Sequence, residues 1–377
     1  MALETATHIN DLVITNPAGG DDLSLGDDHI KLIKQCLKTD LPLTAPATAI
    51  GMSVLTSATA TAVRSLIGAS NNPFRNRVTN GSMAVCQRGN ATLIAGAALA
   101  YVTDMFYAYS TGSNVGAAQT GAPGFNANLQ LTGAAGNTGV GVGTRLLASD
   151  TFDFAGKNVT LSAKLSSSAS GVFTWTAYYA TTADAFGTLL TPTRTSISSG
   201  TFTVTGTETT FAATFAMPSA ATTGIEIVFT FSALPAVTTL TFTNVQLEEG
   251  SIVAADIVFE KIKIQDEKVR CNYHYRRYSG KDGIAVLGAG HQNSTTASRI
   301  ALPAVDMFRI PTITFGGSVM LDTAGASNAA TASTSYSSLN TVALDVTHAA
   351  VGAAGAAAML QLPNGSANFI ELFAGIL

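Results

Sequence analysis

The stretch QLEEGSIVAADIVFEKIKIQDEKVRCNYHYRRY, residues 246–278, holds the densest cluster of charged and aromatic side chains in the chain. Runs of Thr, Ser, Ala and Gly with alternating apolar residues lie on both sides of it. The pattern predicts the last strand of one β domain at 239–247, a turn at Glu249-Gly250, a short helix, and the first strand of a second domain. We interpret residues 251–280 as a hinge.

The composition indicates a folded chain that is mainly β. Of the 377 residues, 12% are charged and 46% are apolar, which is the reverse of the balance that disorder requires. Thr and Ser dominate the polar positions, as suits strands with one solvated face. No regular repeat of the kind found in parallel β-helices is present.

The charge pattern and the apolar pattern exclude several classes of protein. The net charge is −4 and the longest basic run is Arg276-Arg277, so nucleic-acid binding is not expected. No apolar run of about 18 residues predicts a membrane span, and residues 1–11 lack the pattern of a signal peptide. We therefore expect a protein that is made in the cytoplasm and is not inserted into a membrane. The three cysteines form neither a disulfide framework nor a CxxC metal motif.

Residues 1–43 predict a small attachment module. An amphipathic helix begins near Asp27, which can cap it, and places Ile30, Ile33 and Leu37 on one face. So short a helix must pack on another surface, either its own copies or another protein. Residues 44–72 are interpreted as a linker with a short helix at 56–68, or alternatively as a stalk in which symmetric copies of that helix pack together.

Residues 73–250 predict a jelly-roll β-sandwich. Alternation is clean at 159–165 and again at 225–231, so these strands should each turn one face toward another sheet. The expected strands are 77–86, 98–110, 124–132, 141–147, 158–166, 171–180, 200–204, 209–216, 224–231 and 239–247.

Residues 281–377 predict a second β-sandwich, which forms the C-terminal tip. Its expected strands are 283–288, 297–301, 312–315, 337–346, 357–361 and 369–373. The fold class is thus a helical or irregular anchor, a central jelly roll, a short helical hinge and a β tip.

Several motifs, taken in order, resemble tailed-bacteriophage tail fibre proteins. They are ETATHINDLVITNPAGGDDLSLGDDHIKLIK (4–34), TSATATAVRSLIGAS (56–70), NPFRNRVTNGSMAVCQRG (72–89) with YVTDMFYAY (101–109), and QLEEGSIVAADIVFE (246–260) with VRCNYHYRRY (269–278). The third of these is similar to the start of the carbohydrate-binding-module-like jelly roll of such fibres. Met105, Ser82 and the segment before Phe259 depart from the usual pattern.

The resemblance implies a homotrimeric virion protein, a receptor-binding tail fibre without enzymatic activity. Its N-terminus would attach to a phage tail or baseplate protein, and it would mediate adhesion to a host-surface glycan or outer-membrane receptor. Two alternatives stay open: a baseplate adaptor or decoration protein that never contacts the receptor, and a polysaccharide depolymerase. The protein would be assembled in the host bacterial cytoplasm.

Two aromatic clusters are candidate sites. Sugars bind to exposed aromatic rings supported by amides or carboxylates, so Trp175, Tyr178 and Tyr179 are candidate ligand-binding residues. The alternative for Trp175 is packing in the sandwich core. The second cluster is Phe259 with Tyr273, Tyr275 and Arg277, which we interpret as a hinge and trimer interface; a glycan or phosphate site is the alternative.

The carboxylates and histidines predict no catalytic or metal site. Glu248 and Glu249 are neighbours in an extended segment, so their side chains point in opposite directions and could not flank one glycosidic bond. Calcium bound by Glu248, Glu249 and Asp256 is an alternative at the edge of the jelly roll. The five histidines show no metal-binding spacing. No cofactor is expected.

Overall fold

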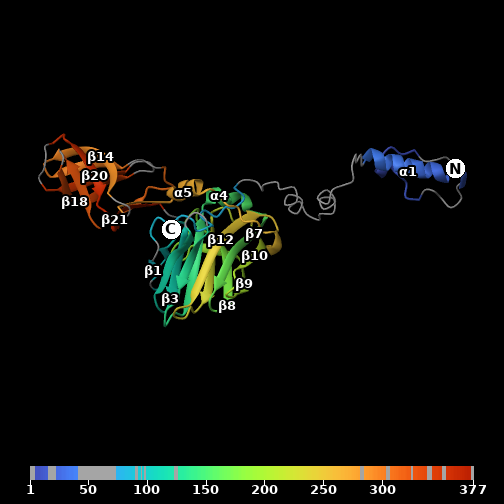
Figure 1. Ribbon diagram of the computed structural model, residues 1–377, viewed down its shortest axis with the longest axis horizontal. Coiled ribbons are helices and arrows are strands. Elements are labelled where there is room, and N and C mark those ends of the chain that lie inside the picture. The colour runs from blue at the N-terminus through green and yellow to red at the C-terminus, as the bar shows by residue number, and fades with distance from the viewer. Residues whose placement is uncertain are drawn as a thin grey trace. The chain divides into compact units, whose positions relative to one another are not determined.

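A computed structural model describes residues 5–15, 23–40, 74–89, 92–94, 96, 99–122, 126–280, 284–302, 306–323, 326–337, 342–349 and 354–374. The chain falls into two compact units, Met1–Asn71 and Asn72–Leu377 (Figure 1). Strands dominate the regular structure, so the predicted mainly β fold class is confirmed. The predicted linker at 44–72, with its short helix, lies outside the described residues. Within the described ranges, no helix is long and apolar enough to cross a membrane.

The first unit is built around helix α1 (Gly26–Asp40), which follows the 3₁₀ turn η2 (Leu23–Leu25). The predicted helix is therefore present, but Asp27 lies in its first turn and binds Lys31 at 2.8 Å instead of preceding the helix as a cap. A second 3₁₀ turn, η1 (Ile9–Asp11), is held to the end of α1 because Asp40 accepts the backbone N–H of Ile9 at 2.6 Å.

Helix α1 buries one side and exposes the other. His29 and Cys36 are buried, whereas Ile30, Ile33 and Leu37 are exposed to between 41% and 54%. The predicted apolar face is thus open to solvent in the described part of the single chain.

Two antiparallel six-stranded sheets form the sandwich. The first sheet, in spatial order, contains β1 (Thr92–Ile94), β4 (Val115–Ala122), β5 (Asn126–Thr132), β12 (Thr239–Glu249), β7 (Asn158–Ser167) and β10 (Thr209–Ala216). The second contains β2 (Ala100–Tyr101), β3 (Phe106–Thr111), β6 (Gly139–Leu146), β11 (Ile225–Ser232), β8 (Gly171–Ala180) and β9 (Arg194–Val204).

The core lies between these sheets, where the alternating residues meet. The apolar positions of β7 and β11 are buried as their period of two predicts. Phe173 of β8 packs against Phe229 on its own sheet and Phe242 of the facing sheet, at ring-centroid distances of 5.8 and 5.2 Å. Contacts of this kind between aromatic rings supply much of the apolar area that stabilises the sandwich.

Several strands of the sandwich differ from those that the sequence predicts. Residues 77–86 form no strand, because Asn80 and Met83 have positive φ values of 59° and 56° that interrupt an extended path. Strand β4 was not predicted, since its sequence VGAAQTGA offers small side chains and little alternation. The predicted strand at 98–110 is in fact the hairpin β2–β3, which turns at Met105 with φ 69°.

The C-terminal strands form a barrel beside a small sheet. Strands β14 (Ala285–Ser294), β15 (Ala297–Leu302), β19 (Val342–His348), β18 (Ala326–Ser337), β17 (Val319–Thr323) and β20 (Ala357–Leu362) close on themselves. The three-stranded sheet has the order β13 (Tyr275–Gly280), β21 (Gly365–Phe373), β16 (Thr312–Gly316).

The predicted C-terminal sandwich is therefore corrected to a closed barrel. Strand β14 pairs with both β15 and β20, so the cycle of strands has no free edge. Gly288 and Gly290 permit this closure, because a Cβ atom on either would lie about 2 Å from a backbone oxygen of β15. The single strand predicted at 337–346 spans the end of β18 and the start of β19, and β17 was not predicted.

The hinge contains the expected short helix, α5 (Ile264–Asn272), which leads directly into β13. Before it, the 3₁₀ turn η4 (Ala254–Asp256) interrupts the extended crossing that follows β12.

Candidate functional site

Glu260 fixes the segment that enters the sandwich. Its carboxylate accepts the backbone N–H groups of Phe74 and Asn76, each at 2.7 Å. The N–H of Glu260 in turn donates to Gln246 at 2.8 Å. Arg75 pairs with the buried Glu248 at 2.6 Å. The motifs NPFRNR, QLEEG and VFE, which are far apart in the sequence, therefore form one hydrogen-bonded network.

A second network joins the sandwich to β13. The side chain of Gln87 donates to Asp104 at 2.6 Å and to the backbone oxygen of Tyr275 at 3.0 Å, and it accepts the N–H of Arg277 at 3.3 Å. The guanidinium of Arg88 lies 3.4 Å from the centroid of the Tyr275 ring. The start of β13 is thus fixed to the sandwich by several independent contacts.

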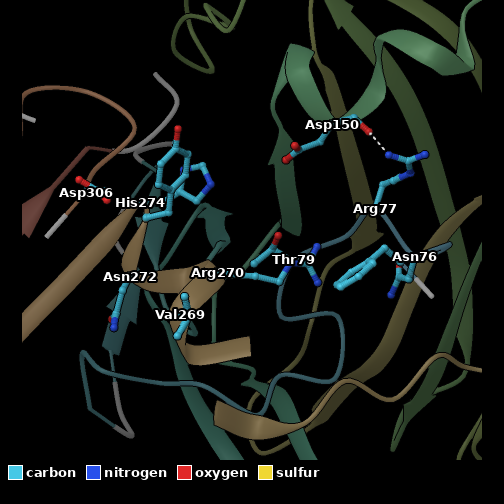
Figure 2. A pocket seen from close by; sticks show the side chains of 11 residues that line it. Asn76, Arg77, Thr79, Asp150, Val269, Arg270, Asn272, His274 and Asp306 are labelled. Carbon is cyan, nitrogen blue, oxygen red and sulfur yellow. Dashed lines mark hydrogen bonds between the residues drawn. The ribbon is translucent and has the colours of Figure 1, made fainter. Parts of the chain in front are cut away.

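Between these networks lies a cleft of about 600 Å³ (Figure 2). It is lined by Phe74, Asn76, Arg77, Thr79, Asp150, Val269, Arg270, Asn272, Tyr273, His274 and Asp306. These residues come from the segment after residue 73, the short helix α4 (Ala148–Thr151), the end of α5 and the loop at 306–311. The cleft is hereafter called the junction cleft.

The junction cleft combines open apolar surfaces with polar groups. Phe74 is 63% exposed and Tyr273 is 42% exposed, so both rings present surface to solvent. Asn76, Asn272, Asp150 and Asp306 supply amide and carboxylate groups in the same lining. Flat apolar surfaces beside amides and carboxylates are what a ligand with CH faces and hydroxyl groups requires.

Arg77 is already engaged on one side of the cleft. It donates to the backbone oxygen of Asp150 at 3.1 Å, the contact drawn in Figure 2, and to the carboxylate of Asp153 at 2.8 Å. Its guanidinium also lies 5.2 Å from the centroid of the Phe154 ring. These contacts hold Arg77 and α4 together as one wall.

His274 is buried at the back of the cleft with 5% exposure. Burial lowers its pKa to about 4, and the nearby charge of Arg270 acts in the same direction, so the ring is neutral at pH 7. It packs against Tyr273 and Phe308 at centroid distances of 5.4 and 5.8 Å. No described residue provides a hydrogen-bond partner for its Nδ1.

The predicted ligand-binding cluster on β8 is not an open surface. Trp175 is 5% exposed and packs between the sheets, with its ring 5.2 Å from that of Phe215. It therefore occupies the core, the alternative that the sequence left open. Tyr178 lies on the opposite face, with the Arg194 guanidinium 4.2 Å from its ring centroid, and Tyr179 is half-buried against the core. A ligand role for these two tyrosines stays a prediction.

The predicted interface residues divide into two groups. The side chains of Tyr275 and Arg277 form hydrogen bonds within the chain. The Tyr275 hydroxyl donates to Glu371 at 2.6 Å, and Arg277 donates to the backbone oxygen of Arg88 at 2.7 Å. Tyr273 is exposed and lines the junction cleft, while Phe259 is half-buried. All four residues lie within 251–280, and both the hinge and a role between subunits stay predictions.

The carboxylates proposed as a calcium site have separate partners. Glu248 is buried with Arg75, whereas Glu249 is exposed and binds Lys157 at 2.7 Å. Among the residues that the structure describes, no cluster of three or more His, Cys, Asp or Glu side chains is arranged to hold a metal ion. The two neighbouring glutamates do point to opposite sides, as expected of an extended chain.

Sequence reasoning did not identify the junction cleft. Phe74, Arg77, Asp150, Arg270 and Asp306 were not candidate residues, although Phe74 and Arg77 stand inside the quoted NPFRNR motif. The signal in the sequence that could have identified the cleft was the aromatic residue Phe74 within the NPFRNR motif, which is rich in Arg and Asn.

The comparisons with known proteins give only partial likenesses. No family model and no curated protein matches the sequence. Among solved structures, the enzymatically active domain of tailspike protein 4 from bacteriophage CBA120 is 16% identical, with a TM-score of 0.31 over 48% of this chain and 22% of that one.

Two further structures match at similar levels. A family 16 carbohydrate-binding module is 18% identical, with a TM-score of 0.25 over 35% of this chain and 84% of that one. A putative sugar-binding protein from Bacteroides thetaiotaomicron is 9% identical, with a TM-score of 0.30 over 46% of this chain and all of that one. TM-scores below 0.5 are too low to carry a function from these proteins to this chain.

Proposed function

We propose that this chain is a non-enzymatic tail fibre protein of a tailed phage that binds a host-surface glycan at the junction cleft. The ordered motifs that resemble tail fibres support the virion role. In the folded chain the contacts of Glu260, Gln87 and Arg88 join these separate motifs to one another. In this proposal α1 attaches the protein to a tail or baseplate protein, and the assembled fibre is a homotrimer.

The observation that carries the glycan proposal is the pair of exposed rings within a polar lining. Phe74 is held at the cleft by the two backbone hydrogen bonds to Glu260. Tyr273 is held at the end of α5, where its backbone oxygen accepts the N–H of Phe308 at 2.8 Å. These hydrogen bonds fix the backbone at both positions, so little backbone entropy is lost when a sugar stacks on the rings.

The experiment is binding of the full chain to an array of bacterial surface polysaccharides, followed by titration calorimetry on the best ligand. Tyr273→Ala should weaken binding by about five- to thirtyfold, since stacking on one ring contributes on the order of 1–2 kcal/mol. Phe152→Ala is the control, because Phe152 is also exposed but does not line the cleft.

Other outcomes would contradict the proposal. Equal loss in both variants would place the glycan elsewhere or indicate unfolding, which thermal melts would distinguish. If the full chain bound none of the polysaccharides on the array, the result would favour the adaptor role. Release of new reducing ends from a bound polysaccharide would favour a depolymerase and contradict the non-enzymatic assignment.

A further inference from the structure

Among the residues that the structure describes, none provides a hydrogen-bond partner for Nη1 of Arg270, a cation that lines the junction cleft. Its ion-pair partner among the described residues is Glu267, with Nη1 3.6 Å from Oε1, beyond hydrogen-bond distance. The same Glu267 oxygen already accepts the backbone N–H of Asn80. Arg270 lies in the last turn of α5, where the helix dipole favours a positive charge. The dipole does not provide a hydrogen-bond acceptor for the side chain.

We propose that the junction cleft selects saccharides that carry a carboxylate, of the uronic-acid type, and that Arg270 binds this carboxylate. The inference rests on the proposed glycan-binding function and names its substrate class. A guanidinium has five N–H donors and no acceptor, and its planar fork matches a carboxylate. A neutral sugar would leave these donors to hydroxyl groups alone, which form weaker hydrogen bonds with them.

The rest of the lining favours one negative charge over two. Asp150 and Asp306 also line the cleft, so a dianionic phosphate would face two carboxylates. The guanidinium of Arg77 is held by Asp153 and the backbone of Asp150. His274 is neutral at pH 7 because burial lowers its pKa to about 4. The Arg270 guanidinium therefore matches one monoanionic group, while the two aspartates can accept hydrogen bonds from sugar hydroxyl groups.

The test compares an oligogalacturonate with its carboxyl-reduced, neutral counterpart by titration calorimetry on the full chain. Wild-type protein should bind the acidic oligosaccharide at least tenfold more tightly. Arg270→Gln should remove this preference by weakening binding of the acidic oligosaccharide much more than binding of the neutral one, because a charge-assisted hydrogen bond contributes about 1.5–3 kcal/mol. Arg270→Lys keeps the charge but loses the fork, so it should give an intermediate preference and remains informative if the Gln variant does not fold.

Arg299→Gln is the matched control, since Arg299 lies in the barrel and is paired with Asp345 at 2.9 Å. Loss of the preference in this variant would indicate a non-specific charge effect and overturn the proposal. Equal binding of the acidic and neutral oligosaccharides by wild type would also overturn it, while leaving the glycan-binding function intact. If Tyr273→Ala changed the affinity for neither oligosaccharide, the junction cleft would not be the glycan-binding site.

A second arm uses small probes and does not depend on finding the natural glycan. Chemical shifts of the Arg270 side chain are followed by NMR during addition of glucuronate, glucose or glucose 6-phosphate. Shifts with glucuronate alone support the proposal. Larger shifts with the phosphate would assign the anion as a phosphate and overturn the carboxylate assignment, and no shift with either anion would overturn it entirely.

Discussion

At the scale of single residues, the chain places several ionisable groups where water does not reach them. Glu226 on β11 is fully buried and lies between Arg145, at 2.7 Å, and Arg194. The Tyr107 hydroxyl donates to the same carboxylate at 2.6 Å. Such a cluster is stable because each charge is paired, and removal of one partner leaves the others uncompensated.

We therefore expect Glu226→Gln to lower the free energy of unfolding by about 3 kcal/mol. The control is Glu208→Gln, because Glu208 is exposed and pairs with Lys164 at 3.1 Å on the surface, where such pairs contribute less than about 1 kcal/mol. Urea denaturation of the two variants measures the difference. Equal, small losses would show that the buried cluster does not stabilise the fold.

His274 gives a prediction on pH. In the unfolded chain a histidine titrates near pH 6.5, whereas in the folded chain burial lowers the pKa of His274 to about 4. Between these values only the unfolded state binds the proton, so the folded state loses stability as pH falls. The contribution is complete above about pH 6.5 and decreases by about 3 kcal/mol down to about pH 4.

His274→Phe removes this titration, so the wild-type free energy of unfolding should decrease more steeply than that of the variant between pH 7 and pH 4. Burial raises the pKa of Asp104, Glu248 and Glu267, which acts in the opposite direction. These groups are present in both proteins, so the difference between the two denaturation series isolates His274. Parallel pH profiles would contradict the account.

At the scale of elements, the sequence predicted best where apolar side chains alternate. Strands β7, β8 and β10 were found almost to the residue, because Val159, Phe173 and Phe211 belong to stretches with a clear period of two. Strands β4 and β18 consist largely of Ala, Ser, Thr and Gly, so no period was visible. Pairing with neighbouring strands, which the sequence does not display, determines those elements.

The junction cleft was not predicted because its parts are distant in the sequence. Phe74 and Arg270 lie almost 200 positions apart, and they are brought together by contacts such as that between Phe74 and Glu260. Trp175 drew attention because it is the only tryptophan, yet its alternating register faces the core. Local patterns identify faces of strands, but they do not identify a cleft formed by four separate segments.

Helix α1 gives a prediction at this scale. Ile30→Asp combined with Ile33→Asp should give folded protein that is missing from virions, because the change replaces the exposed apolar face by charge. Gln35→Asp with Thr39→Asp adds the same charge at exposed polar positions and should be incorporated normally. Immunoblots of purified particles measure incorporation. Normal incorporation of the isoleucine variant would exclude this face as the attachment surface.

At the scale of the whole molecule, the proposal requires assembly into a trimer. Light scattering of the purified full chain should give the mass of three chains of 38.6 kDa each. A stable monomer at micromolar concentration would contradict the fibre proposal.

The most direct test of the central claim is a crystal structure of the full chain with a fragment of the polysaccharide that it binds most tightly. We expect density for the sugar in the junction cleft, stacked on Tyr273 and with a carboxylate on Arg270. Density for the sugar at another surface, with the junction cleft free of it, would contradict the account.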